Sequence, residues 1–226
     1  SKDEVLMKFI IQELKRIDIT WDAEIIEKLT DYDAVIGTGS NNTNRYFEYY
    51  FKKVSHLLRG NRHSIAVING YETEKELDAL ADDIFQYFGL GCRNISFVFV
   101  PAHYDIKQLF PYFDKYKDYV NHNLYKDNYD YNRTLLLMNK NAHLANDFVI
   151  VKEDENIHSR LATVHYKFYE NTEEVLDYIL DNHKDIQTIV GSTTDEWKSI
   201  PFGKAQQPAL NDYADNVDTL EFLLKL

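Results

Sequence analysis

Apolar residues follow two spacings along this chain, and the two spacings alternate. Residues 3–16 carry apolar side chains three and four positions apart, which predicts an amphipathic helix. Short apolar runs predict buried strands, and they lie at 33–36, 64–68, 95–100, 135–138, 148–151, 162–169 and 188–191. Because helical patterns separate several of these runs, the sequence predicts an α/β fold with a largely parallel sheet.

Capping patterns mark two of the helices. Thr73-x-x-Glu76 is a capping box, and it predicts a helix that runs to Phe88 and ends at Gly89. Asn171-x-x-Glu174 begins a helix that we expect to reach residue 182.

Other segments carry weaker signals. Asp22 favours a short second helix, and an aromatic stripe predicts a long helix over 43–58. Residues 106–120 read as a helix bent at Pro111, and the Asn-, Asp- and Tyr-rich residues 121–133 read as a surface loop. The polar residues 191–199 are typical of a turn, whereas 213–226 fits a strand or a helix.

Composition excludes several classes of function. Hydrophobic residues make up 44% of the 226 residues, enough for one large domain or two small ones. A net charge of −12 argues against general nucleic-acid binding, which needs a basic face. A single cysteine excludes an intrachain disulfide and fits a reducing compartment, and no apolar run approaches 18 residues. These features predict a soluble, cytoplasmic protein.

The single cysteine, Cys92, lies in a Gly-x-Gly-Cys turn between a predicted helix and a predicted strand. A lone cysteine is usually a small buried hydrophobe. Two glycines, however, let a substrate approach the backbone closely, as a catalytic thiol requires. From the residues alone, both interpretations stay open.

A second candidate is the turn after the first predicted strand. Thr38, Gly39 and Ser40 stand between that strand and the start of a helix, where exposed N–H groups and the helix dipole favour a phosphate. The alternative is an ordinary tight turn, because such turns are rich in Gly and Ser.

Basic and titratable residues give further candidates. Arg59, Arg62 and His63 form a small basic cluster, which is either solvated surface or a phosphate contact. His122 is a candidate proton donor at the substrate, whereas His165 lies in a predicted strand and is a candidate core residue. No histidine pair has metal-ligand spacing, so we expect no metal.

Three stretches together resemble one known family. They are 33–51, which contains Gly37-Thr38-Gly39-Ser40; 83–94, which contains Gly89-Leu90-Gly91-Cys92; and 200–223, which begins Ile200-Pro201-Phe202-Gly203. In order and spacing they are similar to the LuxC-like acyl-CoA reductases, a branch of the aldehyde dehydrogenase superfamily. The resemblance covers essentially the whole chain.

The resemblance implies an aldehyde dehydrogenase-like architecture. Residues 1–62 would be the C-terminal half of a Rossmann-type dinucleotide-binding domain, and 63–226 a catalytic α/β domain. A further N-terminal portion, which in this family holds the rest of the cofactor fold and an asparagine that binds the oxyanion, would precede Ser1. Related enzymes also associate, so a homo-oligomer is expected.

The resemblance also assigns roles to residues. Cys92 matches the catalytic nucleophile, Thr38, Gly39 and Ser40 match a turn near the cofactor phosphates, and Pro201 and Phe202 match a loop that lines the active site. Glu155 lies beside the position of a glutamate that touches the nicotinamide ribose. The glutamate that activates water in hydrolytic members is absent from residues 58–63, which favours an enzyme that works on thioesters.

The implied reaction is reduction of an acyl-CoA, or of an acyl-protein thioester, to an aldehyde. Cys92 would form the acyl thioester, and NADPH or NADH would supply the hydride. With half of a cofactor site missing, we expect little turnover from these residues alone. The alternative is a non-catalytic binding or oligomerisation module in which Cys92 is a buried structural thiol.

Overall fold

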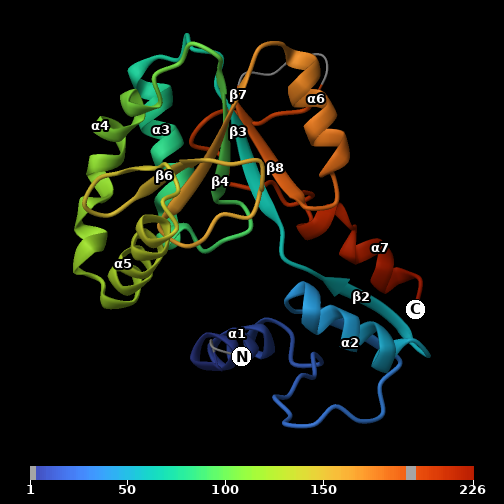
Figure 1. Cartoon of the computed structure of the whole chain (residues 1–226). Helices are drawn as coiled ribbons and strands as arrows, with labels where there is room; N and C mark the ends of the chain where they lie inside the picture. The colour runs from blue at the N-terminus through green and yellow to red at the C-terminus, as the bar shows by residue number, and fades with distance from the viewer. Residues whose placement is uncertain (1–3, 192–196) are drawn as a thin grey trace.

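Two β-sheets of unequal size organise the protein, a parallel pair of strands and a larger, mostly parallel sheet (Figure 1). The computed structural model describes residues 4–191 and 197–226. The smaller sheet pairs β1 (Ala34–Thr38) with β2 (Ser55–Arg59). The larger has the order β5-β6-β7-β4-β3-β8, and its strands are β3 (His63–Val67), β4 (Ile95–Pro101), β5 (Leu144–Ala145), β6 (Ile150–Glu153), β7 (Thr163–Tyr169) and β8 (Ile186–Gly191). Its pairs are parallel except β5–β6, which confirms the predicted α/β class.

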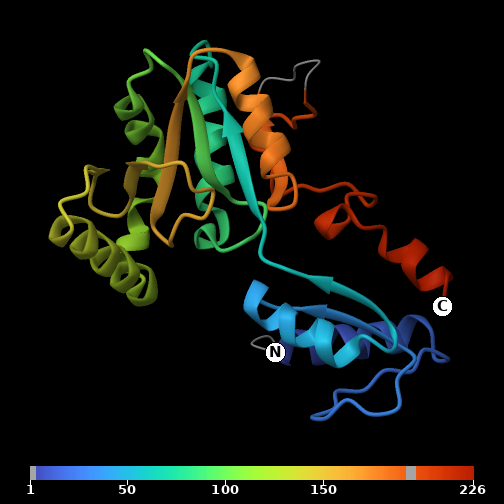
Figure 2. The same ribbon diagram turned by 45° about the vertical axis from the view of Figure 1, so that its right-hand side comes forward.

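Helices flank both sheets (Figures 1 and 2). They are α1 (Glu4–Ile17), α2 (Asn41–Phe51), α3 (Glu74–Phe85), α4 (Phe110–Phe113), α5 (Asn123–Met138), α6 (Thr172–Asp181) and α7 (Thr219–Leu224). Short 3₁₀ turns lie at Gln86–Gly89, Ile106–Leu109, Asp114–Asn121 and Ala214–Asn216. None of the helices in the described ranges is long and apolar enough to cross a membrane.

The larger sheet is buried on both faces. Alternate residues of its strands point to opposite sides, so each strand contributes to two cores. Ala66 and Val98 face the larger core, which α3, α4 and α5 complete. Ile65 and Phe97 face a second core that includes Val175 of α6. Helices on both faces explain why these strands read as continuous apolar runs in the sequence.

Local capping sets where two helices begin, as predicted. The Thr73 hydroxyl accepts the N–H of Glu76, and the Glu76 carboxylate accepts the N–H of Thr73, so the capping box opens α3. The Asn171 side chain accepts the N–H of Glu174 and opens α6. The predicted helix 3–16 is confirmed as α1, although residue 3 lies outside the described ranges. The predicted helix 73–88 is confirmed as α3 only as far as Phe85, because Tyr87 and Phe88 have left-handed backbone angles that end the helix earlier.

The predicted long helix over 43–58 is wrong in its second half. Helix α2 ends at Phe51, and 55–59 form β2, which pairs residue by residue with β1. Leu57 is buried at this pairing, and Leu58 lies against Gly37. The apolar spacing of 54–58 also suits a strand, and pairing with β1 decides between the two.

The predicted surface loop at 121–133 and the predicted strand at 135–138 are also wrong, because residues 123–138 form α5. Tyr125, Tyr129 and Asn132 are buried at spacings of four and three, which is a helical face. Most of the polar residues between them are exposed, and their number made the helical spacing of the buried residues hard to recognise in the sequence.

Two further expectations are wrong, and a third, which was left open between a strand and a helix, is decided. No helix forms around Asp22 in the described structure, and 106–120 consists of α4 between two 3₁₀ turns rather than one bent helix. The C-terminal stretch is helical, as α7. The expected turn at 191–199 lies partly outside the described residues.

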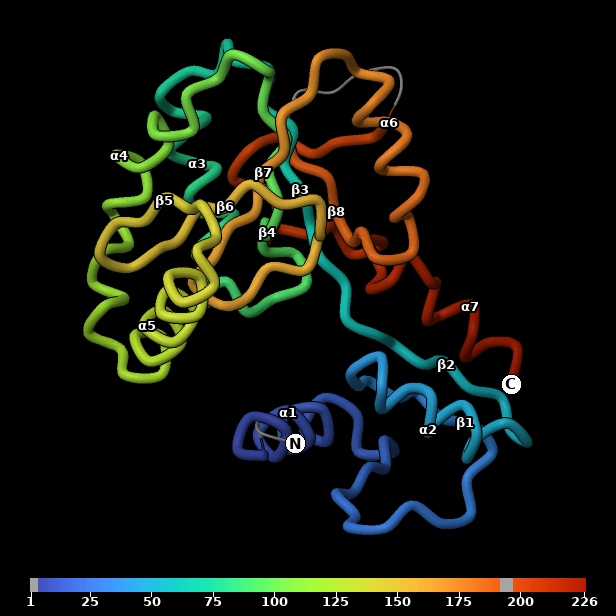
Figure 3. Tube along the Cα trace, in the orientation of Figure 1, coloured from blue at the N-terminus to red at the C-terminus, as the bar shows by residue number. Residues whose placement is uncertain are grey.

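Residues 60–62 join the two sheets (Figure 3). The chain passes from β2 through this segment directly into β3, which lies between β4 and β8 in the larger sheet. The C-terminal residues from Ala214 onward lie beside the same connection. The fold therefore brings the end of β1, the end of β2, the segment before β4 and the C-terminal segment to one place.

Candidate active site

The turn that carries Cys92 is built on left-handed backbone. After α3, Tyr87, Phe88 and Gly89 have φ angles of 55°, 61° and 69°. Non-glycine residues rarely adopt this region, so two in succession indicate a turn that its surroundings hold in place. This turn reverses the chain so that Cys92 lies just before β4.

Asn94 fixes the turn to the end of α3. The Asn94 side chain is 3% exposed, and its amide nitrogen donates to the carbonyls of Asp83, Ile84 and Gln86 at 3.1, 3.2 and 2.9 Å. Its oxygen accepts the N–H of Gly91 at 2.8 Å. The last carbonyls of a helix lack partners within the helix, and Asn94 supplies them here.

The backbone of Cys92 is held from a second side. The buried Ser64 hydroxyl, on β3, donates to the Cys92 carbonyl at 2.9 Å. The Cys92 side chain itself is exposed. The expectation of a buried structural thiol is therefore wrong, because the surrounding hydrogen bonds hold the main chain and leave the sulfur accessible.

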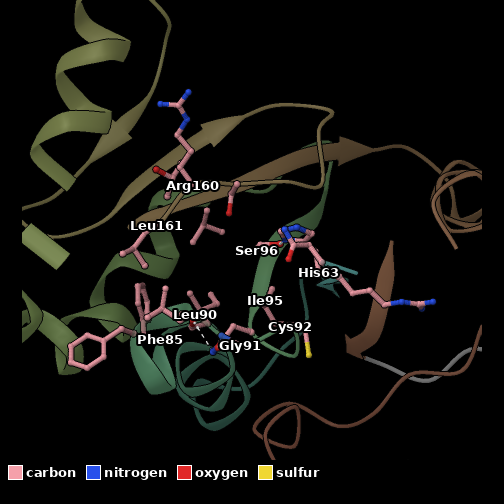
Figure 4. A pocket seen from close by; sticks show the side chains of 18 of the residues that line it. His63, Phe85, Leu90, Gly91, Cys92, Ile95, Ser96, Arg160 and Leu161 are labelled. Carbon is pink, nitrogen blue, oxygen red and sulfur yellow. Dashed lines mark hydrogen bonds between the residues drawn. The ribbon is translucent and has the colours of Figure 1, made fainter. Parts of the chain in front are cut away.

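Cys92 lines a cavity of about 510 Å³. Thr38, Arg59, Arg62 and His63 line the same cavity, so it extends from the smaller sheet to the larger one. In Figure 4 the sulfur of Cys92 and the guanidinium of Arg160, another lining residue, point away from one another. A volume of this size is typical of small-molecule and cofactor sites.

Two arginines form one wall of the cavity. Arg62 pairs with Asp215 at 3.2 Å and also donates to the carbonyl of Ile186 at 3.2 Å. Arg59 donates to the Thr219 hydroxyl at 2.6 Å, and its buried Nε has no partner in the described structure. Because Arg62 already has a carboxylate partner, Arg59 is the better placed to bind an anionic ligand.

His63 is a lining residue that the sequence offered only as part of a basic cluster. Its Nδ1 lies 3.3 Å from the Ser96 hydroxyl oxygen, and that hydroxyl donates to the carbonyl of Ile157 at 3.1 Å. Since Ser96 has one proton to give, its oxygen accepts from His63, so Nδ1 carries the hydrogen and Nε2 is left as a base. Burial lowers the pKa of His63 to about 4, so the ring is neutral at pH 7.

The turn at 38–40 is tied to the start of α2 and to β2. The Ser40 side chain caps α2 by accepting the N–H of Thr43 at 3.2 Å, and Gly39 donates to the carbonyl of Arg59 at 3.1 Å. Thr38 and Arg59 are paired at the carboxyl ends of β1 and β2. Of the three predicted residues, Thr38 alone lines the cavity with Cys92.

The loop at 201–205 packs behind the site. Phe202 contacts the larger core, and buried Asp83 of α3 accepts the N–H groups of Gly203 and Ala205 at 2.6 and 2.9 Å. Burial raises the pKa of Asp83 to about 6. Pro201 and Phe202 lie outside the lining of the cavity, so this loop supports the end of α3 rather than the cavity wall.

Two other predicted residues lie apart from Cys92. Glu155 is exposed and pairs with Lys167 at 2.9 Å. His122 is exposed, and its ring contacts that of Phe88 in a tilted arrangement, with 4.5 Å between ring centroids. Neither lines the cavity that holds Cys92. His165 is buried and bonded through Nδ1 to the Asn156 carbonyl at 2.7 Å, in agreement with a core role.

The structure resembles solved aldehyde dehydrogenases. KauB of Pseudomonas aeruginosa matches with a TM-score of 0.53 and 13% identity over 72% of this chain and 40% of that one. AldH of Staphylococcus aureus, in a substrate-bound state, matches at 0.52 and 13% over 73% and 42%. An aldehyde dehydrogenase of Bacillus cereus in complex with NAD+ matches at 0.52 and 14% over 75% and 43%.

These likenesses establish the fold. The aligned part of the chain has the α/β fold of the aldehyde dehydrogenases, and this chain spans about two fifths of the length of those proteins. No protein-family signature matches the sequence, and no curated protein sequence is significantly similar to it.

The residues at the small sheet suit a phosphate-bearing cofactor. Ligands of open parallel sheets bind beyond the carboxyl ends of the strands, where Thr38 and Arg59 lie side by side. The buried, unpaired Nε of Arg59 is a donor at that position. Across the described residues, no group of three or more His, Cys, Asp or Glu side chains is arranged to hold a metal ion.

Proposed function

We propose that this chain is the cysteine-bearing part of a nicotinamide-dependent oxidoreductase that reduces an acyl-CoA, or an acyl-protein thioester, to an aldehyde. The observation that carries the proposal is the exposed Cys92 thiol on a fixed backbone, in a cavity shared with Thr38 and Arg59. The fold shared with aldehyde dehydrogenases supports the oxidoreductase class, and the LuxC-like motifs support the thioester substrate.

In the proposed reaction, the Cys92 thiolate attacks the thioester carbonyl, forming a new carbon–sulfur bond and expelling the CoA thiolate. The oxyanion needs hydrogen-bond donors. The backbone N–H of Cys92 is one candidate, since the hydrogen bond from Ser64 to the Cys92 carbonyl holds this residue in place. When bound, NADPH or NADH supplies the hydride. The Cys92–carbon bond then breaks, which releases the aldehyde and restores the thiolate.

The surrounding residues would bind and orient the reactants. Arg59 is proposed to bind a phosphate of the cofactor or of CoA, with Arg62 held by Asp215 as a secondary contact. Thr38, Gly39 and Ser40 would lie on the cofactor side. Residues 58–63 hold no carboxylate, so no glutamate of that segment activates water against the acyl thioester.

Intact-mass spectrometry of the full-length protein tests whether Cys92 is the nucleophile. After incubation with a long-chain acyl-CoA, we expect one acyl group per chain, and none on Cys92→Ala. Equal labelling of the two proteins would show that Cys92 is not the acceptor. As a check on access, Cys92 should react with iodoacetamide without denaturant.

We further propose that catalysis needs a preceding portion of the same protein, and that copies of the protein associate. The apolar face of α1 supports this, since Val5 is 85% and Phe9 57% exposed. Little or no NADPH-dependent aldehyde formation is expected from the 226 residues alone, and robust turnover would contradict this part of the proposal.

The competing function is a non-catalytic binding module. Its premise of a buried thiol is lost, but the exposed face of α1 also fits a partner surface. The acylation experiment separates the two functions, because a binding module would not take up an acyl group at Cys92.

A further inference from the structure

A second cavity, of about 260 Å³, lies between α5, β6 and β7. Its lining includes Asn132 of α5, Asn139 at the end of that helix, Lys152 of β6, Thr163 of β7, and His158 and Arg160 of the loop before β7. Arg160 and Thr163 line both this cavity and the one that holds Cys92. The loop at 156–162 therefore separates two cavities with different linings.

Most side chains that line the second cavity are polar, and its formally charged residues are Lys152, Asp154 and Arg160. Lys152 forms an ion pair with Asp154, so these two charges offset one another. His165, also in the lining, is bonded to Asn156, and burial lowers its pKa, which favours the neutral ring. The positive charge of Arg160 is therefore not offset by this ion pair or by His165.

Arg160 has no carboxylate partner in the described structure. Its hydrogen-bond contact is a long one, 3.4 Å to the Asn132 side-chain oxygen. Figure 4 shows its guanidinium directed away from Cys92. Arg160 is exposed, so its guanidinium is accessible to an anion, which in a protein of net charge −12 would have to be held by local donors.

Thr163 adds an independent observation. The residue is 9% exposed, and its hydroxyl is hidden from solvent without a hydrogen-bond partner. An unpaired buried polar group carries a free-energy cost, because it has lost its bonds to water. An occupant of the cavity that reaches this hydroxyl would remove that cost.

We propose that this second cavity binds a small oxyanion, a carboxylate or phosphate group, with Arg160 as the charged contact and the Thr163 hydroxyl as a neutral donor. The volume equals that of about nine water molecules, which suits inorganic phosphate or a short carboxylic acid and is too small for a whole dinucleotide. The proposal does not depend on Cys92 or on its reaction.

Titration followed by ¹⁵N NMR, at constant ionic strength, tests this site. Inorganic phosphate is one probe and succinate the other, so the two arms distinguish a phosphate from a carboxylate ligand. We expect saturable shifts confined to residues around Asn132, Lys152 and Arg160 with at least one probe. Shifts that stay linear with both probes, or that spread over the whole surface, would overturn the proposal.

Three variants sharpen the test. Arg160→Gln should weaken binding at least tenfold, whereas Arg45→Gln, an exposed arginine of α2, should leave it unchanged. Equal affinity of these two variants would show that Arg160 is not the charged contact. Thr163→Val keeps the shape of the side chain and should weaken binding severalfold with the fold intact, and unchanged affinity would remove the hydroxyl from the site.

Discussion

Replacing Asn94 with alanine should loosen the Cys92 turn and destabilise the whole protein. The Asn94 amide has two hydrogens shared among three carbonyls of α3, and its oxygen accepts one N–H from Gly91. Three hydrogen bonds at about 1 kcal/mol each amount to about 3 kcal/mol of unfolding free energy. For a chain of this size, that loss corresponds to a melting temperature lower by about 6–12 °C.

The control is Asn171→Ala, which removes the cap of α6 far from the turn. Loss of a helix cap costs about 1 kcal/mol. Thermal unfolding measures both variants, and amide hydrogen exchange of residues 86–94 should accelerate in Asn94→Ala alone. If Asn94→Ala melts no lower than the control and the exchange of that segment is unchanged, Asn94 does not hold the turn.

Three further predictions concern neighbouring residues. Ser64→Ala should lower the unfolding free energy by about 1 kcal/mol, through loss of the bond to the Cys92 carbonyl; a neutral effect in chemical denaturation would contradict the assigned bond. Burial raises the pKa of Asp83 to about 6, so between about pH 6 and its unfolded value the folded state binds the extra proton, and stability relative to Asp83→Asn should increase as the pH falls from 7 to 5. A difference that shrinks over that range would refute the pKa direction. Burial lowers the pKa of His63 to about 4, so its ring should stay neutral from pH 8 to pH 5 with the hydrogen on Nδ1, and an NMR titration centred near pH 6 would refute this.

Sequence-based prediction worked where the signal was local. The capping box at Thr73 needs four residues, and the structure contains it as predicted. Runs such as 95–100 fit strands buried on both faces, and the larger sheet has them there. These features depend on neighbours along the chain, so the sequence contains the information directly.

Prediction failed where tertiary contacts decide. Residues 55–59 are a strand because β1 lies beside them, which the spacing within 43–58 could not reveal. Helix α5 was hidden by its polar outer face, although Tyr125, Tyr129 and Asn132 had helical spacing. That spacing is the signal that would have found it.

In the candidate site, too, some residues could be predicted from a local sequence signal, whereas others depend on long-range contacts. Cys92 and its glycine-rich turn stood out in the sequence, and Arg59 and Arg62 were candidates that the fold places in the same cavity. The roles of Asn94, Ser64 and Asp83 depend on bonds to residues that are not their immediate neighbours, and no short motif marks them.

The contacts of Arg59 and Arg62 also bear on how the molecule is made. Arg59 is the last residue of β2 and Arg62 lies just before β3, whereas their partners Thr219 and Asp215 stand far later in the chain. Domains fold as units, starting from the N-terminus during synthesis. The arginine wall of the Cys92 cavity is therefore fixed only after the chain has been synthesised past residue 219, so a chain interrupted before residue 215 would present the thiol without these contacts.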